Sequence, residues 1–520
     1  MSPHTVASLI GSRRRDALVA GLRCTTSDTA TVIAPFTGTP LHELPQSSAR
    51  DVRDAAASAR TAQSAWQAAG FAYRRRVLLR AHDLLLERQE ELLDLLQTES
   101  GKTRGQAFEE IFQAASVTRY YAVSAERVLA TKRRRAGIPL VMSTRVSYSP
   151  KQLIGVVTPW NYPIALGAMD VVPALAAGSA VIQKIDNQGA LSMLATREAY
   201  IDAGVPAAVW PIVAGPGNQV GNAVVDSSDY ICFTGSTPTG TTVGKRAAGR
   251  LIGASLELGG KNPLLVLGDA DPVQAAADAV YACFASMGQL CVSIERIYVH
   301  ESIAEEFTRA FTERVAALSQ SATLDYSSDV GSLTSKAQLE RVQAHVQDAV
   351  TKGATVLAGG VARPDIGPYF FAPTVLTGVT AEMECWANET FGPVVAITTV
   401  ASDTDAINQA NNSEFGLNAS VFSGSLTHAH RVAARLDAGS VNINEGYRGS
   451  FSSVDAPMGG MKHSGLGRRN GPEGILRFVQ SRTISQSKGI LQLPRSGAEF
   501  AAMAGMMVTL LTVLKVLRRR

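Results

Sequence analysis

The sequence predicts an α/β protein with two doubly wound domains. Short apolar strands alternate with helical stretches at intervals of about 25 residues. These predicted strands are LIGVVT (153–158), SAVIQ (179–183), AVWPIV (208–213) and YICFT (230–234). A second alternation begins with NPLLVL (262–267) and includes RIYVH (296–300) and VVAITTV (394–400). Strands that are apolar throughout are typical of parallel sheets covered by helices on both faces.

The composition narrows the class of protein further. Of the 520 residues, 46% are hydrophobic and 18% are charged, which excludes a disordered, collagenous or disulfide-framework chain. The chain is longer than one hydrophobic core supports, so two or three domains are expected. The 49 Lys and Arg residues nearly balance 45 Asp and Glu residues, which argues against a nucleic-acid-binding surface.

The cysteines and histidines indicate a reducing compartment and no metal site. The five cysteines show no CxxC spacing, and the N-terminal residues lack the basic-then-apolar pattern of a signal peptide. We therefore expect a cytoplasmic protein in which each cysteine is either a buried structural residue or a reactive thiol. The eight histidines include no HExxH motif and no Cys/His cluster, so no metal is expected.

Helices dominate the chain before the first strand alternation. Residues 47–100 have a helical pattern that begins with a capping box at Ser48 and ends at Gly101. A second helix is predicted over 106–129. The basic run 132–135 that follows is interpreted as a solvated surface turn.

Two motifs follow strands of the first alternation. In Thr158-Pro-Trp-Asn-Tyr-Pro163, two prolines stiffen a turn at a strand end, where doubly wound sheets bind ligands, and Asn161 offers an amide donor. The alternative is an asparagine that caps its own turn. In 233–240, FTGSTPTG, glycines and hydroxyls open a helix, which favours phosphate binding but is weak evidence without GxGxxG.

A carboxylate and a thiol are the remaining candidates. Glu257 lies in an apolar, glycine-flanked segment, where desolvation would raise its pKa toward that of a general base. The alternative is a structural glutamate paired with Lys261. Cys291 follows Gly288-Gln-Leu and is a candidate nucleophile, although a cysteine is more often inert and buried.

Taken together, these four features resemble the aldehyde dehydrogenase superfamily over about residues 32–485. Glu257 and Cys291 are 34 residues apart, the usual interval in that superfamily. Four further segments match it: Glu389-Thr-Phe-Gly-Pro393, Gly416-Leu-Asn-Ala419, Gly439-Ser-Val-Asn-Ile-Asn444 and Gly459-Gly-Met-Lys-His-Ser-Gly-Leu-Gly-Arg468.

The resemblance implies oxidation of an aldehyde to a carboxylic acid through a thioester. Cys291 would be the nucleophile, and the Asn161 amide with the Cys291 backbone N–H would stabilise the thiohemiacetal oxyanion. Glu257 would activate the water that hydrolyses the thioester. Members that transfer the acyl group to coenzyme A usually lack this glutamate, so its presence favours hydrolysis.

The resemblance also implies the cofactor contacts, which are Thr158, Trp160, Asn161, Lys184, Asn187, Gly217, Gly235, Ser236, Gly240, Leu258, Glu389 and Phe391. Lys184 and Asn187 would face the adenosine ribose. A glutamate at 187 would repel a 2′-phosphate, whereas neutral Asn187 does not, and Lys184 can pair with phosphate. NADP is therefore the expected cofactor, and NAD remains possible.

For the substrate, the resemblance is greatest to actinobacterial-type succinic semialdehyde dehydrogenases. The two arginines that hold the substrate carboxylate in better-known members are replaced here by Met169 and Ala285. Arg448 or Lys462 could serve instead. The alternative is a medium- or long-chain apolar aldehyde in a pocket that contains three methionines, Met169, Met287 and Met458.

The resemblance further implies a domain organisation and an oligomer. The cofactor-binding domain would comprise 20–135 and 149–258, and the catalytic domain 259–455. A small β element, 136–148 with 481–493, would bridge subunits of a homodimer or homotetramer.

The C-terminal tail, 498–520, is predicted to be an apolar helix with a basic end. Its uncharged run 500–514 would reach about 22 Å, short of the roughly 30 Å hydrocarbon core of a bilayer. Spanning is therefore not expected. The tail is interpreted either as a peripheral membrane anchor or as a helix packed on its own domain or on another subunit.

Overall fold

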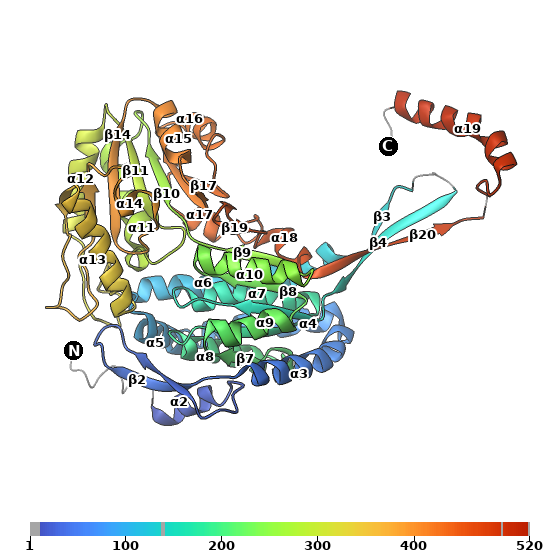
Figure 1. The fold of residues 1–520 in the computed structure, drawn as a ribbon, viewed down its shortest axis with the longest axis horizontal. Coiled ribbons are helices and arrows are strands. Elements are labelled where there is room, and N and C mark those ends of the chain that lie inside the picture. Colours follow the sequence, from blue (N-terminus) through green and yellow to red (C-terminus); the bar gives the residue numbers. More distant parts are fainter. Residues whose placement is uncertain (1–10, 137–140, 490–491, 518–520) are drawn as a thin grey trace.

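The computed structural model describes residues 11–136, 141–489 and 492–517 and confirms the α/β fold class. A six-stranded and a seven-stranded sheet form the body, and a three-stranded arm projects from it (Figure 1). The domain boundaries given above remain predictions. Residues 137–140 and 490–491 of the predicted bridging element, and 518–520 of the predicted tail helix, lie outside the described residues.

The six-stranded sheet has the order β19-β9-β8-β5-β6-β7. All neighbours are parallel except β19, which runs antiparallel to β9 and brings a late segment of the chain back to this sheet. The strands are β5 (Leu153–Val157), β6 (Ala180–Ile185), β7 (Ile212–Ala214), β8 (Tyr230–Thr234), β9 (Gly253–Glu257) and β19 (Gly465–Leu466).

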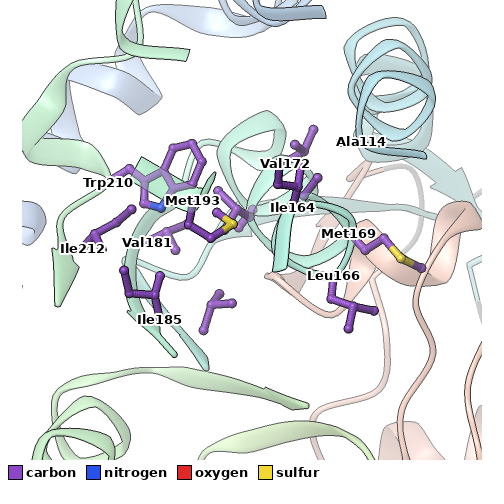
Figure 2. Packing of buried hydrophobic residues seen from close by; sticks show 14 of the residues in the cluster. Ala114, Ile164, Leu166, Met169, Val172, Val181, Ile185, Met193, Trp210 and Ile212 are labelled. Atoms are coloured by element: carbon purple, nitrogen blue, oxygen red, sulfur yellow. The ribbon is translucent and has the colours of Figure 1, made fainter. Parts of the chain in front are cut away.

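Helices cover this sheet, and one of them is wholly inside. Every residue of α7 (Pro163–Ala177) is buried, because the helix packs against both the sheet and α6. Figure 2 shows Met169 of α7 on the opposite side of that helix from Met193 and Trp210. The other helices of this half are α2 (Ser12–Val19), α3 (Ala49–Ala68), α4 (Gly70–Glu87), α5 (Gln89–Ser100), α6 (Arg104–Leu129), α8 (Ala190–Asp202), α9 (Asn222–Ser227) and α10 (Thr237–Gly249).

The seven-stranded sheet has the order β12-β13-β14-β11-β10-β16-β17 and is parallel except at β12. Its strands are β10 (Asn262–Val266), β11 (Ile294–His300), β12 (Thr355–Ala358), β13 (Thr374–Thr377), β14 (Val394–Val400), β16 (Asn418–Phe422) and β17 (Ser440–Ile443). Its helices are α11 (Pro272–Phe284), α12 (Ala304–Ala316), α13 (Lys336–Thr351), α14 (Glu384–Ala387), α15 (Asp403–Asn411), α16 (Leu426–Ala433) and α17 (Arg448–Phe451).

The arm joins segments that are far apart in the chain. It has the order β20-β4-β3, with β3 (Lys132–Arg134), β4 (Met142–Pro150) and β20 (Val479–Ser487) all antiparallel. Two two-stranded antiparallel sheets complete the body: the hairpin β1 (Thr29–Ile33) with β2 (Pro40–Pro45), and β15 (Phe415–Gly416) with the distant β18 (Met461–Lys462). The helix α18 (Gly471–Leu476) also belongs to it.

Beyond the arm, α19 (Gly497–Val516) lies away from the body (Figure 1). It is twenty residues long rather than the fifteen of the apolar run, and no residue in it is buried. By length and composition it is the one helix of the described residues that could cross a membrane. The expectation that it packs on its own domain is therefore wrong.

The structure corrects three local predictions. The helical stretch 47–100 is divided into α3, α4 and α5, although its capping box at Ser48 and its end at Gly101, with a φ of +76°, are confirmed. The basic run 132–135 is exposed as predicted, but most of it is strand β3 rather than a turn, because it pairs with β4. Residues 207–209 form a 3₁₀ turn, so β7 begins only at Ile212.

Candidate active site

A cleft of about 650 Å³ opens at the carboxyl ends of β5 and β8. The strand order reverses direction between these two strands, which is where doubly wound sheets bind nucleotides. Among the predicted cofactor contacts, the cleft is lined by Thr158, Trp160, Lys184, Gly217, Gly235 and Ser236. Gln183 fixes the first of these by donating from Nε2 to the Thr158 hydroxyl at 3.1 Å.

The first turn of α10 forms one wall of the cleft and suits a phosphate. Its N-cap is Ser236, but the hydroxyl turns to Thr239 Oγ1 at 3.0 Å instead of capping the helix. The side chain of Ser236 therefore leaves the backbone N–H groups of that turn free. A helix end needs such free N–H groups to bind an anion. Gly240 permits close packing, since a Cβ there would lie 2.2 Å from the Leu258 side chain. A nicotinamide dinucleotide therefore fits this cleft.

Lys184 and Asp186 both line the cleft. Asn187 is not among the lining residues. Its amide instead pairs with Gln46, with N–O distances of 3.3 and 3.4 Å. The acidic group nearest to Lys184 on this wall is therefore Asp186, which sequence reasoning left out of the site.

The loop before Cys291 is strained and tightly packed. Ser286 and Met287 both have positive φ values, 49° and 59°, which non-glycine residues adopt at a cost of about 1 kcal/mol or more each. At Gly288, with φ +67°, a Cβ would lie 2.1 Å from the Gly392 carbonyl oxygen. Gln289 ties the loop down, accepting from Thr334 N at 3.0 Å and donating to Ser286 O at 3.2 Å.

Two asparagines hold the backbone of Cys291 from the other side. Asn262 donates from Nδ2 to Cys291 O at 2.8 Å and to Ser293 O at 2.7 Å. Its Oδ1 accepts from the backbone of Asn418, whose own amide donates to Val292 O at 3.0 Å. The position of the thiol is therefore fixed by β10 and β16.

Asn161 reaches this same loop from β5. Its Nδ2 donates to Gln289 O at 3.0 Å, two residues before Cys291, which leaves a second amide N–H for another acceptor. Lys102 supports Asn161 by donating to its backbone carbonyl at 2.6 Å. Lys102 is in turn paired with buried Glu110, which accepts from the first backbone N–H groups of α7. The alternative of an asparagine that caps its own turn is not what the structure shows.

Glu257 ends β9 inside the protein and is only 3% exposed. Its Oε1 has no hydrogen-bond partner among the described residues. Burial raises the pKa of this carboxyl to about 7, against which the charge of Arg469 acts. The suggested pairing with Lys261 is wrong, because Lys261 is ion-paired with Glu295.

Glu389 and Phe391 lie beside the same loop. Glu389 accepts from Gly260 N at 2.8 Å, and burial raises its pKa to about 7. Phe391, with φ +54°, packs edge-on against Trp160 at a centroid distance of 5.6 Å. Glu389 thus lies against the backbone at Gly260, and Phe391 lies against Trp160 of the cleft.

The thiol of Cys291 is protonated in this arrangement. Burial and then the negative charges of Glu257 and Glu389 raise its pKa to about 12. A nucleophilic thiolate therefore requires a base. Of the two carboxylates, Glu257 has the larger effect on the pKa of the thiol.

The two basic candidates for the substrate differ in their surroundings. The Lys462 amino group is engaged with Asn411 O, Ser413 O and Asp437. The Arg448 guanidinium lies 4.5 Å from the centre of the Tyr281 ring and is half exposed, and it is ion-paired with Glu445, with Nη2 3.1 Å from Oε2. Met169, Met287 and Met458 are buried.

An aromatic path leads from Arg448 toward Asn161. Tyr281 stacks on Tyr447, which packs on Phe451, and Phe451 contacts Tyr162, the residue after Asn161. Tyr281 and Ala285 also line a hollow of about 320 Å³. Arg448 thus lies at the outer end of an aromatic path that ends beside Asn161.

Sequence comparisons find relatives over most of the chain. The aldehyde dehydrogenase family model matches residues 23–484. A relative from Mycolicibacterium smegmatis, named "Putative succinate-semialdehyde dehydrogenase, NADP(+)", is 50% identical over 87% of this chain and 88% of its own. A relative from Mycobacterium tuberculosis with a similar name is 49% identical over 88% of this chain and 89% of its own.

Solved structures give the same result. A structure titled as an Escherichia coli NADP-dependent enzyme has a TM-score of 0.86 at 33% identity and covers 90% of this chain and 96% of its own. The structure of betaine aldehyde dehydrogenase from Staphylococcus aureus in complex with NAD+ also has a TM-score of 0.86. It is 29% identical and covers 91% of this chain and 94% of its own. The chain belongs to the aldehyde dehydrogenase family.

Proposed function

We propose that this protein oxidises an aldehyde to a carboxylic acid with Cys291 as nucleophile and Glu257 as base. The observation that carries the proposal is the buried, unpartnered Glu257 carboxylate, with a pKa of about 7, acting electrostatically on the Cys291 thiol. A carboxylate with that pKa exists in both protonation states near neutral pH, as a general base requires.

Each residue has a role in the proposed sequence. Glu257 takes the thiol proton, and the Cys291 sulfur bonds to the aldehyde carbon. The second N–H of Asn161 and the backbone N–H of Cys291 hold the oxyanion. The nicotinamide cofactor, when bound, supplies the hydride acceptor, and a thioester is left on Cys291. Glu257 next releases the thiol proton to solvent and deprotonates the water that attacks the thioester carbon. The C–S bond then breaks, the carboxylic acid is released, and Glu257 returns a proton to the Cys291 sulfur.

The test is to trap the thioester. Glu257→Gln should form the acyl group on Cys291 slowly, because the thiol has lost its base, and should then retain it, because the hydrolytic water has lost its base too. Prolonged incubation with an aldehyde and oxidised cofactor should therefore leave an acyl group on Cys291 that intact-protein mass spectrometry detects. Cys291→Ala is the matched control and should carry none. An acylated Cys291→Ala protein, or turnover by it, would contradict the proposal.

For the substrate, we propose succinic semialdehyde, with Arg448 as the cation that binds its carboxylate. The relatives' names and the exposed Arg448 at the outer end of the aromatic path support this assignment. Arg448→Met should raise KM for succinic semialdehyde at least tenfold and leave KM for hexanal unchanged, whereas Lys462→Met should change neither. A higher kcat/KM of the unaltered protein for hexanal would favour the apolar alternative.

For the cofactor, we propose NADP in preference to NAD. Lys184 in the cleft is available to a 2′-phosphate, and no glutamate stands at position 187 to repel it. The ratio of kcat/KM for the two cofactors measures the preference, and Asn187→Glu should shift it toward NAD. A tenfold preference of the unaltered protein for NAD would overturn this assignment.

We also propose that the arm joins subunits of a homodimer or homotetramer. Its strand β20 is exposed along nearly its whole length, and both edge strands, β20 and β3, offer unpaired backbone groups. Light scattering should give two or four subunits, and Ile484→Lys on β20 should lower that number. A monomeric unaltered protein would contradict the proposal.

The proposal extends to contact between α19 and a membrane. Between Glu499 and Lys515 the helix has no charge, and the hydroxyls of Thr509 and Thr512 donate to carbonyls four residues back at 2.8 and 2.9 Å. Twenty helical residues reach about 30 Å. The full chain should float with anionic vesicles, and a chain without residues 498–520 should not. Equal flotation of both would contradict this contact.

A further inference from the structure

A buried cluster of three charges lies beside the active-site base. Asp170 of α7 is fully buried, and its carboxylate accepts from Arg469 at 3.0 and 2.5 Å and from Arg477 at 2.6 Å. Arg469 is 2% exposed, and the side chain of Arg477 is 7% exposed. One carboxylate thus faces two guanidinium groups, which leaves a net charge of +1 inside the protein.

This cluster is connected to Glu257 through the chain on two sides. Arg469 donates to the hydroxyl of Thr234, and Thr234 is the register partner of Glu257 across β8 and β9. Arg469 also exchanges backbone hydrogen bonds with Met458. The next residue, Gly459, lies against Glu257, since a Cβ there would be 3.1 Å from Glu257 Oε1.

The charges balance only when Glu257 is ionised. An isolated buried charge is costly, so the excess +1 favours a neighbouring negative charge. Burial favours the protonated form of Glu257. The positive charge of Arg469 favours the ionised form, so the pKa rises only to about 7. Asp170 acts in the opposite direction, and Arg477 and the nearby Arg468 act in the same direction as Arg469. The neighbouring thiols, Cys291 and Cys232, are neutral.

We propose that the Asp170–Arg469–Arg477 cluster keeps Glu257 ionisable as the base, with Arg469 as the positioning residue. This inference rests on the proposed role of Glu257. Arg469 touches none of the reacting atoms, and it acts through the charge that it adds beside the carboxylate.

The two halves of one ion pair provide the test. Arg469→Gln removes a positive charge, so the pH at which acyl-enzyme hydrolysis reaches half its maximum should rise by about one unit. Asp170→Asn removes a negative charge and should lower that pH by a similar amount. If the ion pair were only structural, both variants would lose activity to the same extent, and the pH midpoint of acyl-enzyme hydrolysis would not shift in opposite directions.

The measurement is the decay rate of the Cys291 acyl group against pH, by rapid quench and mass spectrometry. Arg469→Lys keeps the charge and should leave the midpoint unchanged, and Asp170→Asn remains the informative variant if Arg469→Gln does not fold. Arg60→Gln, which breaks a separate ion pair with Asp229, is the control for loss of an arginine.

Failure of this inference is distinct from failure of the proposed function. If Glu257→Gln traps the acyl group but neither Arg469→Gln nor Asp170→Asn shifts the midpoint, the cluster has no influence on the base. If Glu257→Gln hydrolyses the acyl group at the normal rate, Glu257 is not the base and the proposed function itself fails.

Discussion

At the scale of single residues, the oxyanion role proposed for Asn161 uses the N–H that its bond to Gln289 O leaves free. Asn161→Ala should lower kcat by a factor on the order of 10² to 10³, the usual effect of losing one oxyanion donor. Steady-state kinetics would measure it. The KM for the cofactor should not change, and a loss confined to that KM would assign Asn161 to binding instead.

Asp186 gives a second prediction at this scale. Its carboxylate lines the cleft with Lys184, so it repels a 2′-phosphate that Lys184 attracts. Asp186→Asn should therefore increase the NADP-to-NAD ratio of kcat/KM severalfold. Asn187→Asp is the matched change next to it, and it should have the opposite sign. An unchanged ratio in Asp186→Asn would place the 2′-phosphate elsewhere.

Residue identities predicted the reactive groups but not what holds them. Cys291, Glu257 and Asn161 were predicted because thiol, carboxylate and amide are recognisable reagents in glycine- or proline-rich settings. Asn262, Asn418 and Arg469 were missed, because their importance comes from contacts between segments distant in the chain. An asparagine that holds a backbone carbonyl has no signature in its own neighbourhood.

At the scale of elements, the loop from Ser286 to Gly288 connects α11 to the nucleophile through strained backbone. Gly288→Ala would combine a positive φ with a Cβ 2.1 Å from the Gly392 carbonyl. It should destabilise the protein by more than about 2 kcal/mol in urea unfolding and lower kcat severalfold.

Gly353 is the control for that substitution. Its φ is +101°, but a Cβ there would meet nothing within 4 Å. Gly353→Ala should therefore cost about 1 kcal/mol, from backbone strain alone, and leave kcat unchanged. Equal destabilisation by the two variants would mean that the close approach at Gly288 is relieved at no cost.

Helices and strands were predicted well where the hydrophobic periodicity of the sequence determines them. They were predicted poorly where pairing with a distant strand determines them. The fold class follows from apolar strands alternating with helices. The strand β3 was missed because a run of basic residues has no strand pattern, and only its pairing with β4 makes it one. The register that brings Thr234 beside Glu257 was likewise beyond the sequence pattern.

At the scale of the whole molecule, the buried carboxylates lower stability in alkaline solution. The pKa of Glu257 is raised to about 7 from an ordinary 4.5, so the folded state holds this proton more tightly than the unfolded state. Its stabilising contribution is full below about pH 4.5 and is lost as pH rises through 7. Glu389 behaves in the same way.

Glu257→Gln should therefore raise the free energy of unfolding by up to about 3 kcal/mol above pH 7. Below about pH 4.5 the difference from the unaltered protein should vanish. Thermal unfolding at several pH values would measure it. A difference independent of pH would mean that packing, rather than ionisation, causes the change.

The arm has a consequence for biosynthesis. Met142 pairs with Ser487 and Pro150 with Val479, so β4 finds its long partner only when some 330 further residues have been made. A nascent chain on the ribosome has already completed the first five parallel strands of its nucleotide-binding sheet while β4 still lacks β20. The subunit joining proposed for this element would therefore be postponed until translation is nearly finished, which would protect half-made chains from premature association.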